Sequence, residues 1–107
     1  MRKLYIVKTN QQFDDIITNG KCYKNKYFVI YNKDNNLKYD RFGISVTKKL
    51  GNAVFRNKYK RIIRSILDNY KKLYINNKDY IIILRKDAIA CDYELLTNEL
   101  FSLLNHN

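Results

Sequence analysis

A run of basic and polar side chains between Gly51 and Arg64 has the spacing of one helix face. At about 100° per residue these side chains fall into one arc, and apolar side chains fill the opposing arc. Arginine can pair with phosphate oxygens through two parallel hydrogen bonds, and asparagine can bond to a base edge or a sugar. The pattern therefore favours a surface that holds a polyanion, and its members are Arg56, Asn57, Lys60, Arg61 and Arg64.

A solvated basic face is the simpler interpretation of such a helix. However, almost no acidic side chain neutralises this one before Asp68. Uncompensated like charge destabilises a folded chain unless a partner supplies the counter-charge. The opposing arc predicts a packed face made of Tyr59, Ile62, Ile63, Ile66, Tyr70 and Leu73.

The same run resembles the signature of the bacterial ribonuclease P protein component. In that family the helix opens with Gly-Asn-Ala-Val, followed by Arg-Asn-Arg, then Lys-Arg and a further Arg. Residues 51–54 match the opening, and the basic arc supplies the later places. Lys58 stands where the family usually has arginine, and it falls outside the basic arc. The similarity covers nearly the whole chain.

The composition points to the same kind of partner. The 107 residues carry a net charge of +11 at pH 7, and the pI is near 9.7. Such a balance favours nucleic acid over an anionic membrane or an acidic protein. No stretch approaches the roughly 20 apolar residues of a membrane span, so we expect no membrane association. The length is typical of one domain, residues 1–107.

Catalytic groups are not evident in the chain. Cys22 and Cys91 lack metal-ligand spacing, and we interpret both as reduced thiols of a cytoplasmic protein. Protein nucleases need clustered carboxylates or well-placed histidines. Asp14 and Asp15 are expected in the first turn of a helix, where they complement its dipole, and the only histidine, His106, lies beside the terminus. The sequence predicts turn or cap positions for Asp79, Asp87 and Asp92.

Hydrophobic periodicity predicts the order helix, three strands, helix, strand, helix within one α+β domain. Thr9 and Gln12 form a capping box for a helix over residues 10–19, and Gly20 ends it. The basic helix is expected over residues 54–73, and Asp92 should cap the last helix. The predicted strands are 21–23, 27–32 and 41–46, which form an antiparallel unit, and 80–84, which is buried on both faces.

Alternation in strand 41–46 suggests a place for a ligand. Phe42, Ile44 and Val46 point to one side, whereas Gly43 and Ser45 point to the other and leave room for a groove. Aromatic side chains beside a shallow groove stack on bases of any identity. Ordinary core packing is the alternative for such aromatic residues.

The loop 47–52 joins that strand to the basic helix. Gly51 permits a turn, and Asn52 is a suitable N-cap. Helix N-termini attract phosphate, and Lys48 and Lys49 add to that field. Capping alone explains Gly51 and Asn52 but not the two lysines.

The family resemblance implies a function. In ribonuclease P an RNA subunit, with Mg²⁺ bound mainly by that RNA, hydrolyses precursor tRNA, removes its 5′ leader and leaves a 5′ phosphate. The small basic protein, one monomer in the holoenzyme, binds this catalytic RNA and the leader. The resemblance places the leader in a cleft between the first helix and the sheet, lined here by Phe13 and Tyr31, and by Ile17 where an aromatic residue is frequent. It assigns RNA binding to Lys48, Lys49, Asn52, Arg56, Asn57, Lys58, Lys60, Arg61 and Arg64.

The family's fold is an α/β sandwich similar to domain 2 of ribosomal protein S5, with a left-handed crossover around the basic helix. General physics favours the right hand in about 98% of such crossovers. Two other functions stay open. A structural ribosomal or general RNA-binding protein would share the charge and the aromatic residues, and a DNA-binding module would place the long helix on duplex DNA.

Overall fold

The computed structural model describes residues 5–70 and 77–105. Within them the elements follow the predicted order, with a short 3-10 turn added before the last helix. They are α1 (Asn10–Asn19), β1 (Lys21–Lys24), β2 (Phe28–Asp34), β3 (Arg41–Ser45), α2 (Ala53–Asp68), β4 (Lys78–Leu84), η2 (Lys86–Ala88) and α3 (Tyr93–Asn105). The predicted α+β class is therefore confirmed.

The first helix begins at the predicted capping box. Oγ1 of Thr9 accepts from the Gln12 amide at 3.1 Å, and Oε1 of Gln12 accepts from the Thr9 amide at 3.2 Å. The placement of Asp14 and Asp15 in the first turn was wrong, because the helix begins at Asn10 and its first turn holds no acidic residue. Asp15 instead accepts from Lys33 Nζ at 2.6 Å.

The four strands form one mixed sheet in the order β1-β2-β4-β3. β1 and β2 pair antiparallel, and β4 lies antiparallel to β2 and parallel to β3. The prediction of one antiparallel unit from the first three strands was therefore wrong for β3. β4 carries an almost continuous run of buried side chains, and a strand that is apolar on both faces is stable only in the sheet interior. β4 therefore occupies an interior position of the sheet, and β3 forms an edge.

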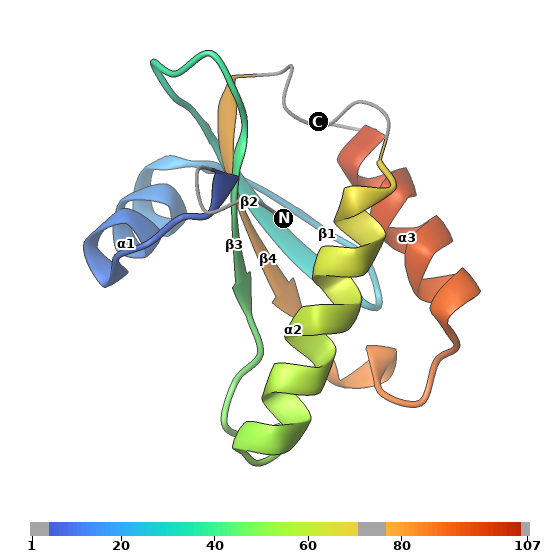
Figure 1. Ribbon diagram of the computed structural model, residues 1–107. Coiled ribbons are helices and arrows are strands. Elements are labelled where there is room, and N and C mark those ends of the chain that lie inside the picture. Colours follow the sequence, from blue (N-terminus) through green and yellow to red (C-terminus); the bar gives the residue numbers. More distant parts are fainter. Residues whose placement is uncertain (1–4, 71–76, 106–107) are drawn as a thin grey trace.

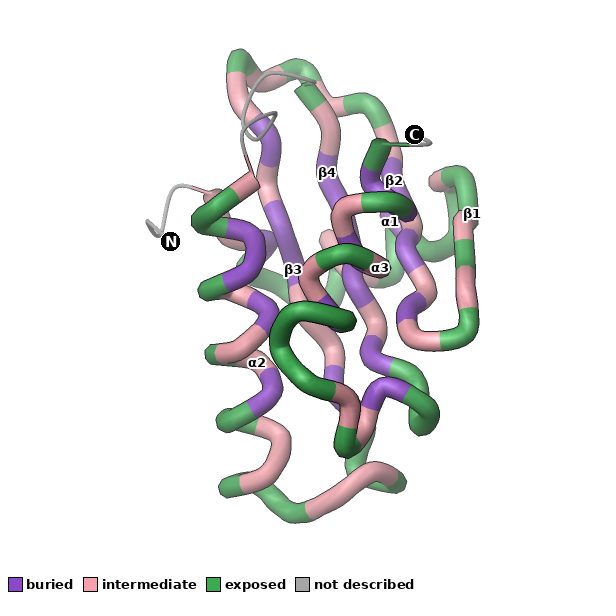
Figure 2. Tube along the Cα trace, turned by 90° about the vertical axis from the view of Figure 1, so that its right-hand side faces the viewer, coloured by how far each residue is buried: buried purple, intermediate pink, exposed green. Residues whose placement is uncertain are grey.

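The connection from β3 through α2 to β4 is a left-handed crossover. Both strands point downward in Figure 1, and α2, which connects them in the chain, runs upward over one face of the sheet. In Figure 2 the helical face is turned to the viewer, and β4 lies to the right of β3. If this view is rotated in its plane until both strands point upward, the helix remains in front of the sheet and β4 lies to the left of β3. A right-handed crossover would place β4 to the right. The left-handed crossover that the resemblance implies is therefore confirmed, although most such crossovers are right-handed.

Helices cover the two faces of the sheet unequally, as Figure 1 shows. α2 and α3 lie on one face, and their buried side chains join Phe28, Ile30 and Phe42 in the larger core. Ile44 and Val46 also belong to that side, as their alternation predicted. α1 lies on the other face over a smaller core made of Val7, Ile16 and Ile81, with Phe13, Tyr31 and Ile83 packed against it.

The central helix is shorter than predicted and ends at Asp68, not at residue 73. Asn69 leaves the helical conformation, and its Nδ2 donates to the Ser65 carbonyl at 3.2 Å. An asparagine side chain competes with the helix for such backbone groups. Tyr70 lies beyond the helix and donates to Asn105 Oδ1 at 2.7 Å, and Leu73 lies outside the described residues. The residues that α2 buries are Tyr59, Ile63, Ile66 and Leu67, with Ile62 half-buried.

The predicted turn and cap aspartates have different fates. Asp92 caps α3, because its Oδ1 accepts from the Leu95 amide at 2.8 Å. Asp87 lies exposed in η2. Asp79 is not a turn residue but a buried member of β4. Its carboxylate accepts two hydrogen bonds from Arg41, and this pairing explains how a negative charge is tolerated at a buried position.

Candidate RNA-binding surface

The polar residues of α2 occupy two surfaces of the helix. Asn57, Lys58 and Arg61 are exposed, whereas Arg56, Lys60 and Arg64 are half-buried. The Ser65 and Tyr93 hydroxyls are hydrogen-bonded at 2.9 Å, which places Ser65 on the flank facing α3. At about 100° per residue, Arg56 and Lys60 lie on the other flank, beside the buried stripe, whereas Arg64 and Ser65 line a pocket with Tyr93 of α3.

We call Arg56, Asn57, Lys60, Arg61 and Arg64 the basic stripe. None of its four cations forms an ion pair or a side-chain hydrogen bond with another residue among 5–70 and 77–105. Nε of Arg56 is buried without a partner in this part of the chain, so the protein's own hydrogen bonds do not hold that group. The stripe thus carries uncompensated positive charge on a rigid element. Such a surface attracts polyanions.

The loop before α2 adds charge at the start of the stripe. The Leu50 amide donates to the Thr47 carbonyl at 3.1 Å, and Lys48 and Lys49 are both exposed. Asn52 caps the helix as predicted, since its Oδ1 accepts from the Phe55 amide at 3.0 Å. Its side-chain nitrogen has no hydrogen-bond partner in the part of the chain that the structure describes.

Gly51 has a different role from the one predicted. Its φ is not positive, so the backbone conformation of the turn does not require glycine. A Cβ at this position would lie 2.5 Å from Cδ1 of Phe55. Glycine is therefore needed because the Phe55 ring packs directly against the backbone of the loop.

The expected leader-binding residues lie on and beneath α1. Phe13 and Tyr31 are half-buried against the smaller core, and Ile17 is 38% exposed. Cζ of Phe13 is 2.5 Å from the place that a Cβ of Gly43 would occupy. The prediction of open room above Gly43 was wrong, because the Phe13 ring fills it. The structure nevertheless brings Phe13 and Tyr31 to one face of the sheet, with Ile17 on the helix above it.

Cys22 is a neighbour of Tyr31 that the sequence did not reveal. The two residues are direct partners across the antiparallel β1–β2 pair, so their side chains share a face. The negative charge of the Cys22 thiolate, the hydrogen bond between the side chains and burial all raise the pKa of Tyr31. The Tyr31 hydroxyl therefore loses its proton less readily than that of an ordinary tyrosine. Only the strand register could have predicted this contact.

Side chains that could ligate a metal ion do not cluster among the described residues. Across 5–70 and 77–105, no three His, Cys, Asp or Glu side chains come together as metal ligands would. The same part of the chain has no helix long and apolar enough to cross a membrane. The surfaces of α2 and α1 present charged, amide and aromatic side chains.

The sequence and the structure both match known proteins. The family described as Ribonuclease P matches residues 1–107. The ribonuclease P protein component of Mycoplasma mycoides is 44% identical over 105 residues, which cover 97% of this chain and 96% of the relative. That of Streptococcus agalactiae is 42% identical over 104 residues, 97% of this chain and 94% of the relative.

Solved structures give the same answer. The Staphylococcus aureus RNase P protein superimposes with a TM-score of 0.84 at 38% identity, covering 94% of this chain and 93% of that one. The Thermotoga maritima protein gives 0.87 at 31% identity, covering 94% and 96%. Fold, basic helix and relatives thus agree, and the chain belongs to the ribonuclease P protein component family.

Proposed function

We propose that this chain is the protein subunit of ribonuclease P, which associates with the RNA subunit of that endoribonuclease and promotes removal of the 5′ leader from precursor tRNA. The observation that carries this proposal is the basic stripe. Its four cations lack partners among the described residues, and they lie on the helix that bears the family signature. Membership of the family supports the choice of RNA.

The RNA subunit and the 5′ leader bind to two different surfaces of the protein. The basic stripe, Lys58 and the loop residues Lys48, Lys49 and Asn52 bind the RNA subunit, mainly through phosphates. Phe13, Ile17 and Tyr31 bind the leader, whose unstacked bases offer flat apolar faces to α1 and the sheet. One protein copy serves one RNA subunit.

Hydrolysis belongs to the RNA subunit in this proposal. Water attacks the phosphodiester at the junction of leader and tRNA, and the mature tRNA keeps a 5′ phosphate. In this proposal Mg²⁺ is bound mainly by the RNA subunit. The protein raises the affinity for the metal ion and for precursor over mature tRNA.

Cleavage of a 5′-labelled precursor tRNA at low Mg²⁺ tests this function. A bacterial ribonuclease P RNA is assayed with and without the purified protein, beside a sample that contains protein alone. We expect the protein to stimulate cleavage at the mature 5′ end only when the RNA subunit is present.

Other outcomes separate the alternatives. Absence of stimulation, combined with tight binding to unrelated RNAs, would favour a structural ribosomal or general RNA-binding protein. Preference for duplex DNA would favour the DNA-binding module. Cleavage by the protein alone would place a catalytic centre in this chain.

A further inference from the structure

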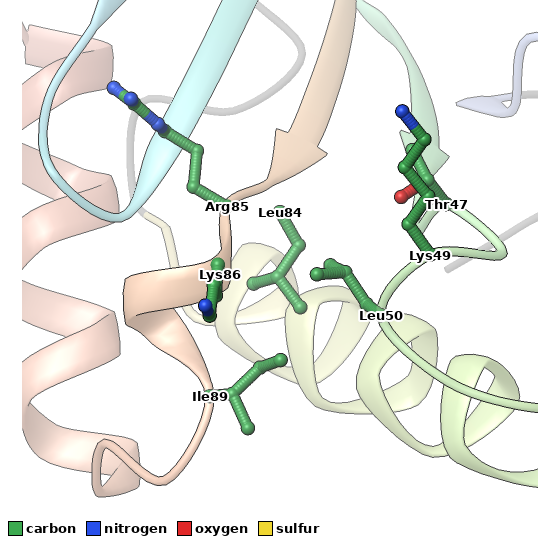
Figure 3. A pocket seen from close by; sticks show the side chains of 7 residues that line it. All are labelled: Thr47, Lys49, Leu50, Leu84, Arg85, Lys86 and Ile89. Carbon is green, nitrogen blue, oxygen red and sulfur yellow. The ribbon is translucent and has the colours of Figure 1, made fainter.

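A pocket lies where the loop before α2 meets the end of β4, and neither the family signature nor the leader-binding face includes it. Its volume is about 520 Å³. Figure 3 shows the seven residues that line it, which come from two segments more than 30 positions apart in the chain. We call it the loop pocket, and its lining residues are Thr47, Lys49, Leu50, Leu84, Arg85, Lys86 and Ile89.

The loop pocket has an apolar floor. The side chains of Leu50, Leu84 and Ile89 point toward one another in Figure 3. Leu84 is only 2% exposed and belongs to the larger core, whereas Leu50 and Ile89 are half-buried. The floor is therefore anchored to the rigid part of the protein and still reachable from outside. A flat apolar group could lie on it at little cost in reorganisation.

The rim of the loop pocket is positive. Lys49 and Arg85 extend away from the apolar floor on opposite sides in Figure 3. Arg85 is fixed by a 2.7 Å hydrogen bond from its Nη1 to the Asn25 carbonyl. Lys49 and Lys86 are exposed, and neither has a side-chain partner in the part of the chain that the structure describes. No carboxylate of the described residues belongs to the lining, since the neighbouring Asp87 lies outside it.

An unstacked nucleotide combines the two chemistries that this pocket offers. Its base presents a flat, largely apolar face, and its phosphate carries a negative charge that complements the positive rim. The volume lies within the roughly 300–1,000 Å³ typical of small-ligand sites. A bare anion would leave the apolar floor uncovered, and an apolar peptide would leave the cations unpaired.

We propose that the loop pocket binds one unstacked nucleotide of the ribonuclease P RNA, with the base on Leu50 and Ile89 and the phosphate between Lys49 and Lys86. The pocket continues the surface of loop 47–52, which faces the RNA subunit in the proposed function, and the two share Lys49. This inference therefore rests on the proposed function. It extends the RNA contact from α2 across to the end of β4.

The test measures binding of the ribonuclease P RNA alone, without precursor tRNA, at several salt concentrations. Lys86→Ala should weaken binding and lower the slope of log affinity against log salt by about 0.7 to 0.9, the value of one lost phosphate contact. Ile89→Ala should weaken binding on the order of fivefold without changing the slope, because it removes only apolar contact. Lys38→Ala removes the same charge at the opposite end of β3 and should bind as wild type.

Chemical probing of the RNA locates the nucleotide. Wild-type protein should change the reactivity of one unpaired base, Lys38→Ala should preserve that change, and Ile89→Ala should abolish it. Circular dichroism establishes whether each variant is folded. If Ile89→Ala unfolds, the Lys86→Ala variant alone tests the proposal. Lys86 is exposed, so we expect its removal to leave the fold intact.

Failure of the inference is distinguishable from failure of the proposed function. If wild-type protein neither binds the RNA nor stimulates cleavage, the proposed function fails. If wild-type protein does both, and the folded variants match it in affinity, slope and probing pattern, only the loop pocket is excluded. Effects that appear only with precursor tRNA present would mean that the occupant is a leader nucleotide, which also overturns the inference.

Discussion

Arginines in two regions of this protein have opposite surroundings. Arg41 in β3 donates from Nε and Nη2 to the two carboxylate oxygens of Asp79, at 2.9 and 2.6 Å. The two side chains are only 20% and 10% exposed. Arg56, Arg61 and Arg64 in α2 have no comparable partner among the described residues.

The difference indicates which charges serve the fold and which serve a partner. The hydrogen bonds that Arg41 donates to Asp79 raise the pKa of Arg41 and outweigh the lowering effect of burial. Asn35 Nδ2 also donates to Asp79 at 2.8 Å, so the pair belongs to a network joining β3, β4 and the loop before β3. Among residues 5–70 and 77–105 the basic stripe has no such network, so binding of an external anion would relieve its repulsion.

Breaking the Arg41–Asp79 pair should have the largest effect on stability. Asp79→Ala leaves a mostly buried guanidinium unpaired, and we expect the free energy of unfolding to fall by about 3–5 kcal/mol. Urea denaturation at neutral pH measures this loss. The double variant Arg41→Met, Asp79→Leu removes both charges and should recover most of it. A single variant as stable as wild type would show that the pair does not support the fold.

Removing two cations from the basic stripe should affect binding, not stability. Arg56→Ala with Arg61→Ala should weaken binding of the ribonuclease P RNA by about tenfold or more, because two charge-assisted contacts are lost. The far-ultraviolet circular dichroism spectrum should be unchanged. Lys8→Ala with Lys38→Ala is the matched control for net charge. Loss of the folded spectrum in the arginine variant would identify the stripe as structural.

A third change sharpens the contrast between charge and stacking. Ile17 is partly exposed where an aromatic ring would extend the leader-binding face. Ile17→Tyr should raise the affinity for precursor tRNA about fivefold through base stacking. The affinity for mature tRNA and the salt dependence should not change. An equal gain for mature tRNA would separate Ile17 from leader recognition.

The exposed pair of Asp15 and Lys33 should have the smallest effect. Hydrogen bonds from Lys33, followed by Asn19, lower the pKa of Asp15 from its ordinary value of 3.8. Its contribution to stability is therefore present above that value and is lost as the pH falls through the lower folded-state pKa. Asp15→Asn should have a slightly lower melting temperature than wild type at neutral pH, and the two should converge once the pH lies below the lowered pKa of Asp15. A constant difference would exclude this linkage.

Features encoded within a few neighbouring residues could be predicted from the sequence. The caps at Thr9, Asn52 and Asp92 were all predicted, since each cap bonds to an amide three residues later. The order of helices and strands was also predictable from periodicity. The end of α2 was not, because Asn69 had to be recognised as a competitor for the Ser65 carbonyl.

Features set by distant contacts could not be predicted in the same way. The buried run in β4 indicated cover on both faces but did not identify β2 and β3 as its neighbours. Helical spacing grouped the basic stripe, whereas the half-burial of Arg56 depends on how α2 rests on the sheet. The shared pocket lined by Lys49 and Lys86 likewise exists only after β4 is in place.

The most direct test of the account is the salt dependence of binding between this protein and the ribonuclease P RNA. Wild type is compared with the Arg56→Ala, Arg61→Ala variant. If the unpaired cations of the stripe meet phosphates, the slope of log affinity against log salt should fall by about 1.5 in the variant. Equal slopes and equal affinities for the two proteins would contradict the claim that the basic stripe holds the RNA.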